Sequence, residues 1–409
     1  MCAAWLLDEQ HEITLLEKND YLGGNTHTVR VNINGKEHLV DDGAAWFSPT
    51  IYPCLNAFMD LTGVEFDLTP MSLTFHNRLT GNSACLPPAE LKTIYKMLSQ
   101  RHVLPEALAL FKILNVSADL VKARNSAITY KEFMSCVNMS TELKENFLRP
   151  LLTALWGSPF SETDGFSMYP MVKYMVSHKP MPFTHYKMKV MRGGCQNYIG
   201  TVHSKLKNTS VLLNDGVASI TPMEQNDTVS VTTQSRKSFE FDHLIIAASA
   251  YDTRAILNNS TGFENANDIL HRFRYYKALL ATHSDVSFMP PKRSDWSLVN
   301  VTSEGNYAAS TVWSGRSSNT DLFCSYVREG EIPQSLHHLS EWWLPLETPD
   351  FFQTQKQLEK LQGQHNVWFA GDYTHDIGSH EDAIVSAIKG VERVDPASSR
   401  LKTMKSKIA

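Results

Sequence analysis

The sequence lacks the features that mark membrane-spanning, secreted and nucleic-acid-binding proteins. No run of about 18 apolar residues occurs, so no transmembrane helix is predicted. Met1–Leu7 has no basic start and is too short for a secretory signal. The formal net charge of -5 and the pI of about 6.3 do not favour binding to polyanions. We therefore expect a cytoplasmic protein without nucleic-acid partners. Peripheral membrane contact and the oligomeric state stay open.

Cysteine is sparse among the 409 residues, and the six cysteines form no C-x-x-C pair. The histidines, including His27 and the pair His337-His338, do not have the spacing of zinc ligands. No arrangement of Ser, His and Asp typical of a hydrolase is visible. These absences predict reduced thiols, no disulfide framework and no metal site. The length suits about two or three domains with a large core.

The stretch Glu12–Thr28 carries the first positive signal. Its apolar run, Ile13–Leu16, predicts a buried strand, and Glu17 stands at the carboxyl end. In a doubly wound sheet, an acid at the end of the second strand accepts hydrogen bonds from the adenosine ribose. Gly23 and Gly24 follow, and glycine lets the backbone approach a pyrophosphate because no Cβ is in the way. The alternative is a surface glutamate followed by an ordinary glycine turn.

The phosphate-binding motif G-x-G-x-x-G belongs about 20 residues before such a glutamate, which places it before Met1. Residues 1–7 resemble the last turns of the helix that follows this motif. We therefore expect the chain to start inside its first nucleotide-binding unit. A truncated gene model, a misplaced start codon and a degenerate copy all remain open.

Between residues 28 and 86 the pattern predicts short strands and one helix. Thr28–Ile33 alternates and Asn34-Gly35 is a hairpin turn signal, so His38–Val40 is expected to return antiparallel. This strand ends in Asp41-Asp42-Gly43-Ala44, where glycine again permits close backbone approach to a ligand. We further expect a helix over 50–62, its C-cap at Gly63, and irregular strands over 68–86.

From Pro88 to Leu155 the pattern turns helical, with a helix start expected at Thr129–Phe133, and Phe166–His178 continues as another helix. Because this block interrupts the nucleotide-binding pattern, we interpret it as an inserted cap over the substrate, with plain helical packing as the alternative. Strands are predicted at 211–233 (three strands), 241–249, 274–285, 296–301, 307–313 and 321–326, and helices at 196–206, 336–343 and 354–361. The basic tail Arg400–Lys407 is expected to be frayed.

A second anchor lies at Asn366–Val394. Its apolar start predicts a buried strand, followed by Gly371-Asp372, a loop and a helix with small residues on one face. The helix begins near Glu381-Asp382, where backbone N–H groups and the positive end of the dipole can face an electron-rich cofactor or its phosphates. Asp372 stands where it can bind a ribityl hydroxyl, and its alternative role is an N-cap or turn residue.

Five motifs come in a fixed order: E-K-x-x-x-x-G-G, D-x-G-A-x-W, R-G-G-x-x-x-Y, D-H-L-I-I-A-A and F-A-G-D. With them the chain resembles the flavin-containing amine oxidase superfamily. It is most similar to predicted FAD/NAD-binding oxidoreductases whose bacterial genes often neighbour cyclopropane fatty acid synthase. The resemblance implies an α/β fold, with a Rossmann-like FAD/NAD(P)-binding domain and a substrate domain of mixed sheet and helices. The implied FAD-binding parts are 1–66, 189–258 and 361–395, the substrate parts are 67–188 and 259–360, and 396–409 is a tail.

The resemblance also implies a role for each matching residue around FAD. Glu17 would hold the adenosine ribose, and Val217 would lie at the adenine. The glycine pair with Asn25 and Thr26 would pass the pyrophosphate and ribityl chain. The remaining implied contacts are Asp41, Gly43 and Ala44 near the isoalloxazine, Gly371 and Asp372 at the ribityl chain, and Glu381, Asp382 and Ala383 at the pyrimidine end.

Two further side chains are candidates for the chemistry. Lys277 lies in the strand where many amine oxidases keep a lysine near the flavin N5, although a solvated lysine at a strand edge is the alternative. His380 can carry protons near neutral pH, or it can be structural. Ser379 stands where many amine oxidases place an aromatic residue, so a typical aromatic cage is not expected.

The predicted function is an FAD-dependent oxidoreductase that transfers hydride from a small molecule to flavin. The expected substrate is lipid-like, isoprenoid or an amine. The alternative is a non-catalytic protein of flavoprotein fold that has lost its cofactor.

Overall fold

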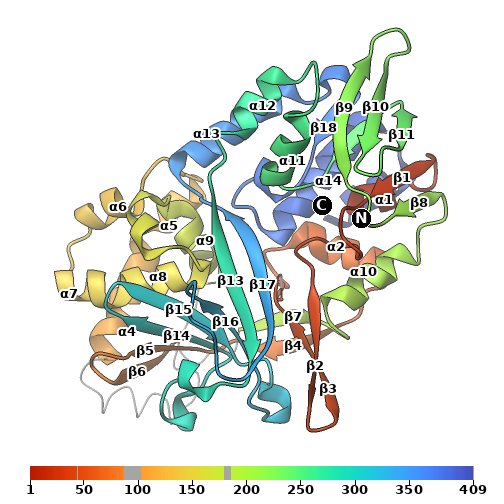
Figure 1. The fold of residues 1–409 in the computed structure, drawn as a ribbon. Helices are drawn as coiled ribbons and strands as arrows, with labels where there is room; N and C mark the ends of the chain where they lie inside the picture. The colour runs from red at the N-terminus through yellow and green to blue at the C-terminus, as the bar shows by residue number, and fades with distance from the viewer. Residues whose placement is uncertain (44, 87–102, 179–185, 409) are drawn as a thin grey trace.

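The computed structural model describes residues 1–43, 45–86, 103–178 and 186–408 (Figure 1). The predicted contact Ala44 and residues 88–102 of the predicted helical block therefore lie outside the described residues. The chain termini lie close together, because the first helix, α1 (Cys2–Leu7), packs against the last one, α15 (Ser399–Ile408).

Two pairs of parallel strands carry the nucleotide-binding pattern. β1 (Ile13–Leu16) pairs with β8 (Thr209–Leu212), and β12 (Leu244–Ile246) pairs with β18 (Val367–Phe369). Within the described residues these are two separate two-stranded sheets. Each residue of β1 is only half-buried, whereas the apolar run predicted a buried strand. The difference arises because β1 has one hydrogen-bonded neighbour, and a buried parallel strand normally has two.

The largest sheet has seven strands and is mixed, since β5 pairs parallel with β14 and the other neighbours are antiparallel. Its strands, in order across the sheet, are β17 (Leu336–Pro345), β13 (Tyr275–His283), β16 (Phe323–Val327), β15 (Tyr307–Val312), β14 (Val299–Glu304), β5 (Leu73–Asn77) and β6 (Asn82–Leu86). In Figure 1 the long strands β13 and β17 run side by side through the centre of the molecule.

The predicted helix over 336–343 is wrong, because this segment is strand β17. It pairs with β13 from Leu336 to Pro345 and forms the edge of the sheet. Trp342 and Trp343 consequently point to opposite faces: the Trp342 indole donates to Asp42, while Trp343 stacks on Tyr251 with ring centroids 4.8 Å apart. Pairing with β13 along its whole length makes this segment a strand, and this pairing is not visible in the local sequence.

The helical block lies beside the large sheet (Figure 1). α8 (Arg149–Trp156) packs on β14 and β15. The other helices of the block are α4 (Val103–Val116), α5 (Ala118–Lys122), α6 (Tyr130–Cys136), α7 (Thr141–Leu143) and α9 (Met168–His178). The helix start expected within residues 88–155 falls at Thr129, where a capping box with Glu132 opens α6.

The remaining elements complete the fold. The predicted hairpin is confirmed as β2 (Thr28–Ile33) and β3 (Lys36–Asp41). α2 (Pro53–Thr62) ends as expected at Gly63, which adopts a left-handed conformation with φ 73°. The others are β4 (Phe66–Pro70), β7 (Lys187–Met191), α10 (Cys195–His203), β9 (Val217–Met223), β10 (Thr228–Thr233), β11 (Ser238–Phe241), α11 (Ala250–Leu257), α12 (Glu264–Leu270), α13 (Pro349–Leu358) and α14 (His380–Val394).

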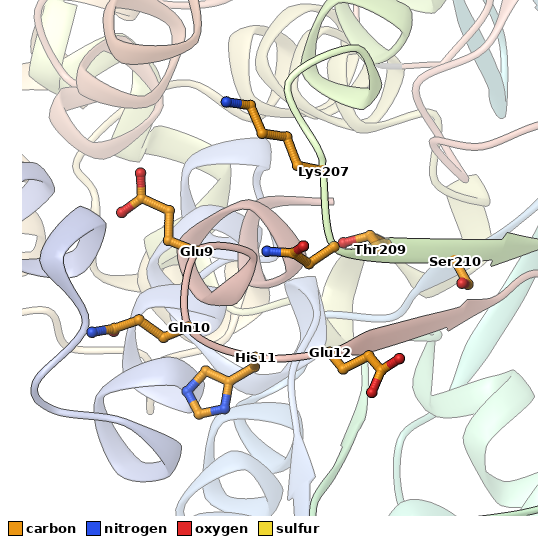
Figure 2. A pocket seen from close by; sticks show the side chains of 8 residues that line it. Glu9, Gln10, His11, Glu12, Lys207, Thr209 and Ser210 are labelled. Atoms are coloured by element: carbon orange, nitrogen blue, oxygen red, sulfur yellow. The ribbon is translucent and has the colours of Figure 1, made fainter.

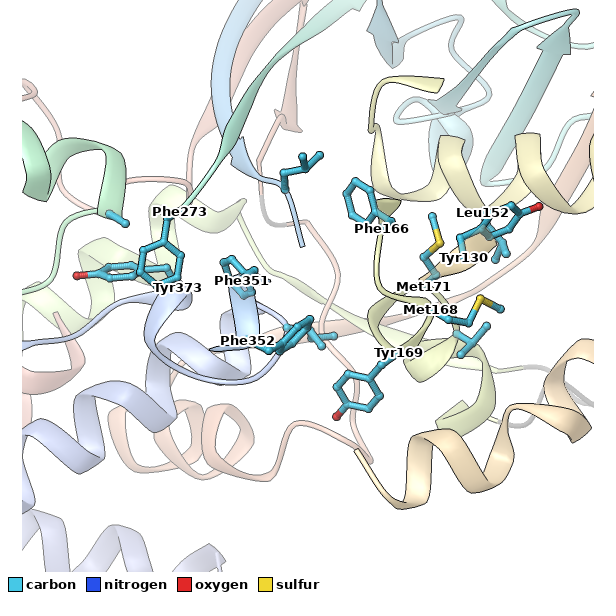
Figure 3. Packing of buried hydrophobic residues seen from close by; sticks show 14 of the residues in the cluster. Tyr130, Leu152, Phe166, Met168, Tyr169, Met171, Phe273, Phe351, Phe352 and Tyr373 are labelled. Atoms are coloured by element: carbon cyan, nitrogen blue, oxygen red, sulfur yellow. The ribbon is translucent and has the colours of Figure 1, made fainter. Parts of the chain in front are cut away.

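One hydrophobic cluster joins the helical block to the strands of the nucleotide-binding pattern (Figure 3). Tyr130 and Phe166 come from the block, Phe273 lies just before β13, and Phe351 and Tyr373 come from the C-terminal segments. All five side chains are at most 1% exposed. A second cluster lies around α1, α2, α10 and α14.

The basic tail is a docked helix, and the expectation of a frayed terminus is wrong. α15 buries Leu401 and Met404 to 1% and 0% exposure against the second cluster. Its lysines lie on the outer side, where Lys405 pairs with Glu392 and Lys407 pairs with Asp60, whereas Arg400 packs over the Trp5 ring and is largely buried. Spacing of three residues puts the two apolar side chains on one helix face.

Candidate functional site

The carboxyl ends of β1 and β18 hold the first residues of the candidate site. Glu17 follows β1, and its carboxylate accepts a hydrogen bond from the Asn19 backbone N–H at 2.9 Å. Gly23 has a φ angle of 118°, which only glycine adopts without strain, and Gly24 has a φ angle of 56°, in the left-handed region that favours glycine. A Cβ added at Gly24 would meet no atom within 4 Å, so the backbone there faces open space. The Thr26 hydroxyl donates to the Gly23 carbonyl and closes this turn.

Asp41 and Gly43 tie this turn to its neighbours. The Asp41 carboxylate accepts hydrogen bonds from the Cys195 N–H (2.9 Å) and the Thr28 hydroxyl (2.6 Å) and so caps the start of α10. A Cβ on Gly43 would overlap the Asn25 carbonyl oxygen, so only glycine fits there. The loop at Asn25 and the strand end at Gly43, both predicted to contact the cofactor, are thus in direct backbone contact.

Asp42 is a buried carboxylate that the sequence analysis did not single out. It accepts hydrogen bonds from His27 Nδ1 (2.7 Å) and from the Ser340 hydroxyl, and its carbonyl accepts the Trp342 indole N–H at 3.0 Å. The hydrogen bond to Asp42 raises the pKa of His27. These contacts join the loop before β2 to β17. The adjacent pair Asp41-Asp42 at a strand end was the available signal for this site.

Glu381 and Asp382 have well-defined structural partners. The two Glu381 carboxylate oxygens accept the Cys54 and Leu55 backbone N–H groups at 2.9 and 2.8 Å, which caps α2. Asp382 accepts the N–H and hydroxyl of Ser379 at 2.9 and 2.6 Å and completes the capping box of α14. Burial raises the pKa of Asp382 to about 6.

His380 opens α14 and packs among aromatic rings. Its ring lies edge-on to Phe47 with centroids 5.0 Å apart, and Nε2 lies 3.4 Å from the Tyr198 hydroxyl. Burial lowers the pKa of His380 to about 4, so the imidazole is neutral at pH 7. These contacts favour the structural alternative over proton transfer near neutral pH.

Lys277 points to the outer face of the large sheet. Its Nζ forms an ion pair with Glu341 at 2.7 Å, and this pairing raises the pKa of Lys277. The next side chain, Tyr276, points the other way and donates to the Trp156 carbonyl at 2.9 Å. β13 lies between β17 and β16 in the sheet, so Lys277 is not on an edge strand, as the alternative interpretation had expected. The ion pair nevertheless favours a solvated role.

The loop between β18 and α14, residues 371–379, brings further predicted residues together. Gly371 has a φ of 121°, and Asp372 Oδ1 accepts the Tyr373 N–H at 2.7 Å, which fits the expected turn role. Burial also raises the pKa of Asp372 to about 6. Ala383 belongs to the first turn of α14, and Val217 starts β9 opposite Thr233.

Glu347, which the sequence analysis missed, lies beside this loop. Its side chain is 4% exposed, and its Oε2 has no hydrogen-bond partner among the described residues. Burial, reinforced by the charges of Asp382, Asp372 and Asp376, raises the pKa of Glu347 far above the usual range, and Lys173 opposes this. Lys173 itself pairs with Asp376 at 2.8 Å. A lone acid after the apolar residues 342–346 was the only sequence signal.

Aromatic side chains gather near Ser379. The Tyr52 hydroxyl donates to the Tyr174 hydroxyl at 2.6 Å, and both interact with the Ser379 side chain. The Trp156 ring lies 5.9 Å from that of Tyr174. Because Ser379 replaces the expected aromatic residue, these rings from other elements supply the aromatic character beside it.

The hollow in Figure 2 is a separate feature. It measures about 520 Å³ and is lined by Glu9–Glu12 and Lys207–Ser210. These residues lie at the amino ends of β1 and β8, whereas open α/β sheets bind ligands at the carboxyl ends of their strands. Within the described residues, no cluster of three or more metal-ligating side chains was found, and no helix there is long and apolar enough to cross a membrane.

The fold defines a class: an α/β protein with two pairs of parallel strands and a separate mixed sheet of seven strands. Residues 1–272 match the family described as flavin containing amine oxidoreductase. The chain belongs to this family, since the match spans well over half of it. No curated protein sequence matches the chain.

Solved structures agree with this assignment at the level of fold. A CLA-producing fatty acid isomerase from P. acnes has a TM-score of 0.67 at 15% identity, covering 96% of both chains. Cyclohexylamine oxidase from Brevibacterium oxydans has 0.63 at 15%, covering 100% of this chain and 95% of its own. Putrescine oxidase bound to putrescine has 0.62 at 13%, covering 96% of both. The predicted amine-oxidase-type fold class is therefore confirmed.

Proposed function

We propose that the chain is an FAD-dependent oxidoreductase that takes a hydride from a small-molecule substrate. The observation that carries this proposal is the placement of Glu17 and Asp372 at the carboxyl ends of two parallel strands, β1 and β18. Ligands of open α/β sheets bind at that edge. Membership of a flavin-containing family supports FAD as the cofactor.

Two observations support a fit to FAD. The open backbone at Gly24, in the loop that follows Glu17, can accommodate a phosphate chain. Glu347 lies beside the 371–379 loop, and its buried Oε2 has no hydrogen-bond partner among the described residues. This oxygen can hydrogen-bond to a polar ring system such as that of FAD. In this proposal Glu17 holds the ribose, residues 23–26 pass the pyrophosphate, and Asp372 binds the ribityl chain.

FAD supplies the two-electron acceptor when it is bound. The chain's own residues orient the reactants and exclude water. Tyr52 and Tyr174 lie beside Ser379, and Glu381 and Asp382 cap α2 and α14 and so help to hold these residues in place. His380 and Lys277 remain weaker candidates for a catalytic role because each already has structural partners.

The substrate class remains a lipid-like molecule, an isoprenoid or an amine. The similar structures include a fatty acid isomerase and two amine oxidases by name, so both ends of this range occur on the fold.

The visible absorption spectrum of the purified chain, before and after added FAD, tests the proposal. We expect the bands of oxidised flavin to remain after excess FAD is removed. Glu17→Ala should retain less FAD, whereas Glu224→Ala, an exposed control, should retain the wild-type amount. A wild-type chain that stays colourless after FAD is removed would support the non-catalytic alternative.

A further inference from the structure

Glu347 stands at the meeting point of three parts of the molecule. It follows β17, its backbone carbonyl accepts the Ser167 N–H from the helical block at 2.8 Å, and its Oε1 lies 3.6 Å from where a Cβ of Gly378 would be. It also lies within electrostatic range of Tyr276 on β13. The side chain therefore sits between the large sheet, the helical block and the loop that leads into α14.

A buried acid without a partner for one oxygen is costly in a folded protein, and such groups normally find a partner. Glu347 Oε2 has none among the described residues, although the side chain is only 4% exposed. A bound molecule with a complementary group would supply the missing hydrogen bond. The unsatisfied oxygen thus indicates a contact that the described part of the chain does not complete.

The charges around Glu347 decide the form in which it acts. Asp372, Asp376 and Asp382 raise its pKa together with burial, while Lys173, the cation in range, is engaged by Asp376. Burial and these charges therefore favour the neutral carboxylic acid form of Glu347 over the carboxylate. In that form it can donate a hydrogen bond, as other carboxyls kept neutral in apolar sites do.

We propose that Glu347 donates a hydrogen bond through its free oxygen to an acceptor atom of the flavin ring system, and so holds the ring at the 371–379 loop. The inference rests on the proposed function. The target is the ring because Asp372 and Asp382, the electrostatic neighbours of Glu347, are the residues expected at the ribityl chain and the pyrimidine end. The isoalloxazine ring offers carbonyl oxygens and ring nitrogens as acceptors.

Binding of riboflavin and of FAD, followed by quenching of flavin fluorescence at pH 7, tests this inference. Riboflavin isolates the ring contact from the phosphate contacts. Glu347→Leu should weaken riboflavin binding by about tenfold, the size of one lost hydrogen bond. Glu347→Gln keeps a donor and should stay within about threefold of wild type. Glu341→Gln, an exposed acid on the same strand pair, is the matched control.

The pH dependence gives a second readout that does not depend on turnover. Raising the pH favours the ionised form of Glu347, which has no proton to donate, so wild-type binding should weaken with increasing pH relative to Glu347→Gln. Circular dichroism checks that each variant folds. Equal binding by wild type and Glu347→Leu, or equal loss in both Glu347 variants, would overturn the inference alone. A wild-type chain that binds neither flavin would overturn the proposed function and this inference together.

Discussion

At the scale of single residues, the acids predicted to touch the cofactor also build the site. Asp41 caps α10, Glu381 caps α2 and Asp382 caps α14, each through hydrogen bonds to backbone N–H groups. A carboxylate at a helix start is stabilised by the free N–H groups and by the helix dipole. These side chains therefore set the positions of three helices around the strand ends.

Glu381 offers the sharpest test of this structural role. Glu381→Ala leaves two N–H groups of α2 without their buried acceptors, so the free energy of unfolding should fall by about 1–3 kcal/mol. Urea denaturation followed by circular dichroism measures the change. Glu392→Ala, which removes an exposed acid paired with Lys405 on α15, should cost less than about 1 kcal/mol. A Glu381→Ala chain as stable as wild type would contradict the capping role.

His27 makes stability depend on pH. Its hydrogen bond to Asp42 raises the folded pKa, so the protonated form is favoured in the folded chain. The stabilisation is complete below the unfolded value of about 6.5 and is lost as the pH rises through the higher folded pKa. The stability difference between wild type and His27→Gln should therefore shrink from pH 5.5 to pH 8.5, a range of about three units around that value. Asp42→Asn should remove the same pH dependence, and a constant difference would contradict the pairing.

At the scale of elements, two segments differ from the sequence prediction for the same reason. β17 is a strand because β13 offers it a long ladder, and α15 is an ordered helix because its apolar side chains pack against α1 and α2. Both partners are far away in the sequence. Local periodicity therefore does not report them.

Met404 tests whether α15 is part of the folded core. The side chain is fully buried, so Met404→Ala should lower the free energy of unfolding by about 2–5 kcal/mol through lost burial and a cavity. Lys402→Ala, on the exposed side of the same helix, should change it by less than about 0.5 kcal/mol. Thermal and urea denaturation measure both variants. Equal stability of the two variants would restore the view of a frayed tail.

At the scale of the whole molecule, one hydrophobic cluster connects parts that the sequence assigns to different domains. Phe147 and Leu151 from the helical block share it with Val229 on β10 and Phe369 on β18. Continuous packing of this kind makes separate unfolding of either part costly. The domain boundaries stay a prediction, and the shared core argues against independently stable units on either side of them.

We expect the chain to unfold in one cooperative transition. Far-UV and near-UV circular dichroism should give the same midpoint on heating, and two separated transitions would contradict the shared core.

FAD at a concentration about 100 times its dissociation constant should add about 2.7 kcal/mol of stability and raise the midpoint of thermal unfolding. Riboflavin, which lacks the phosphates, should raise it less if residues 23–26 contact the pyrophosphate.

The sequence alone determined the local chemistry of this protein. The β2–β3 hairpin follows from alternation around Asn34-Gly35, the end of α2 follows from Gly63, and the helix start at Thr129 follows from a capping box. The ordered motifs likewise predicted the family and the fold class. Each of these signals depends on residues a few positions apart, where side-chain and backbone preferences act directly.

Only the tertiary structure decided the roles that depend on distant neighbours. Glu381 caps α2 from 326 residues away, Lys277 faces outward to Glu341, and Asp42 joins His27 to β17. The tertiary structure also placed Glu347 near three other acids and left its Oε2 without a hydrogen-bond partner among the described residues. Burial and long-range pairing set these roles, because the pKa and partners of a side chain depend on what surrounds it in space.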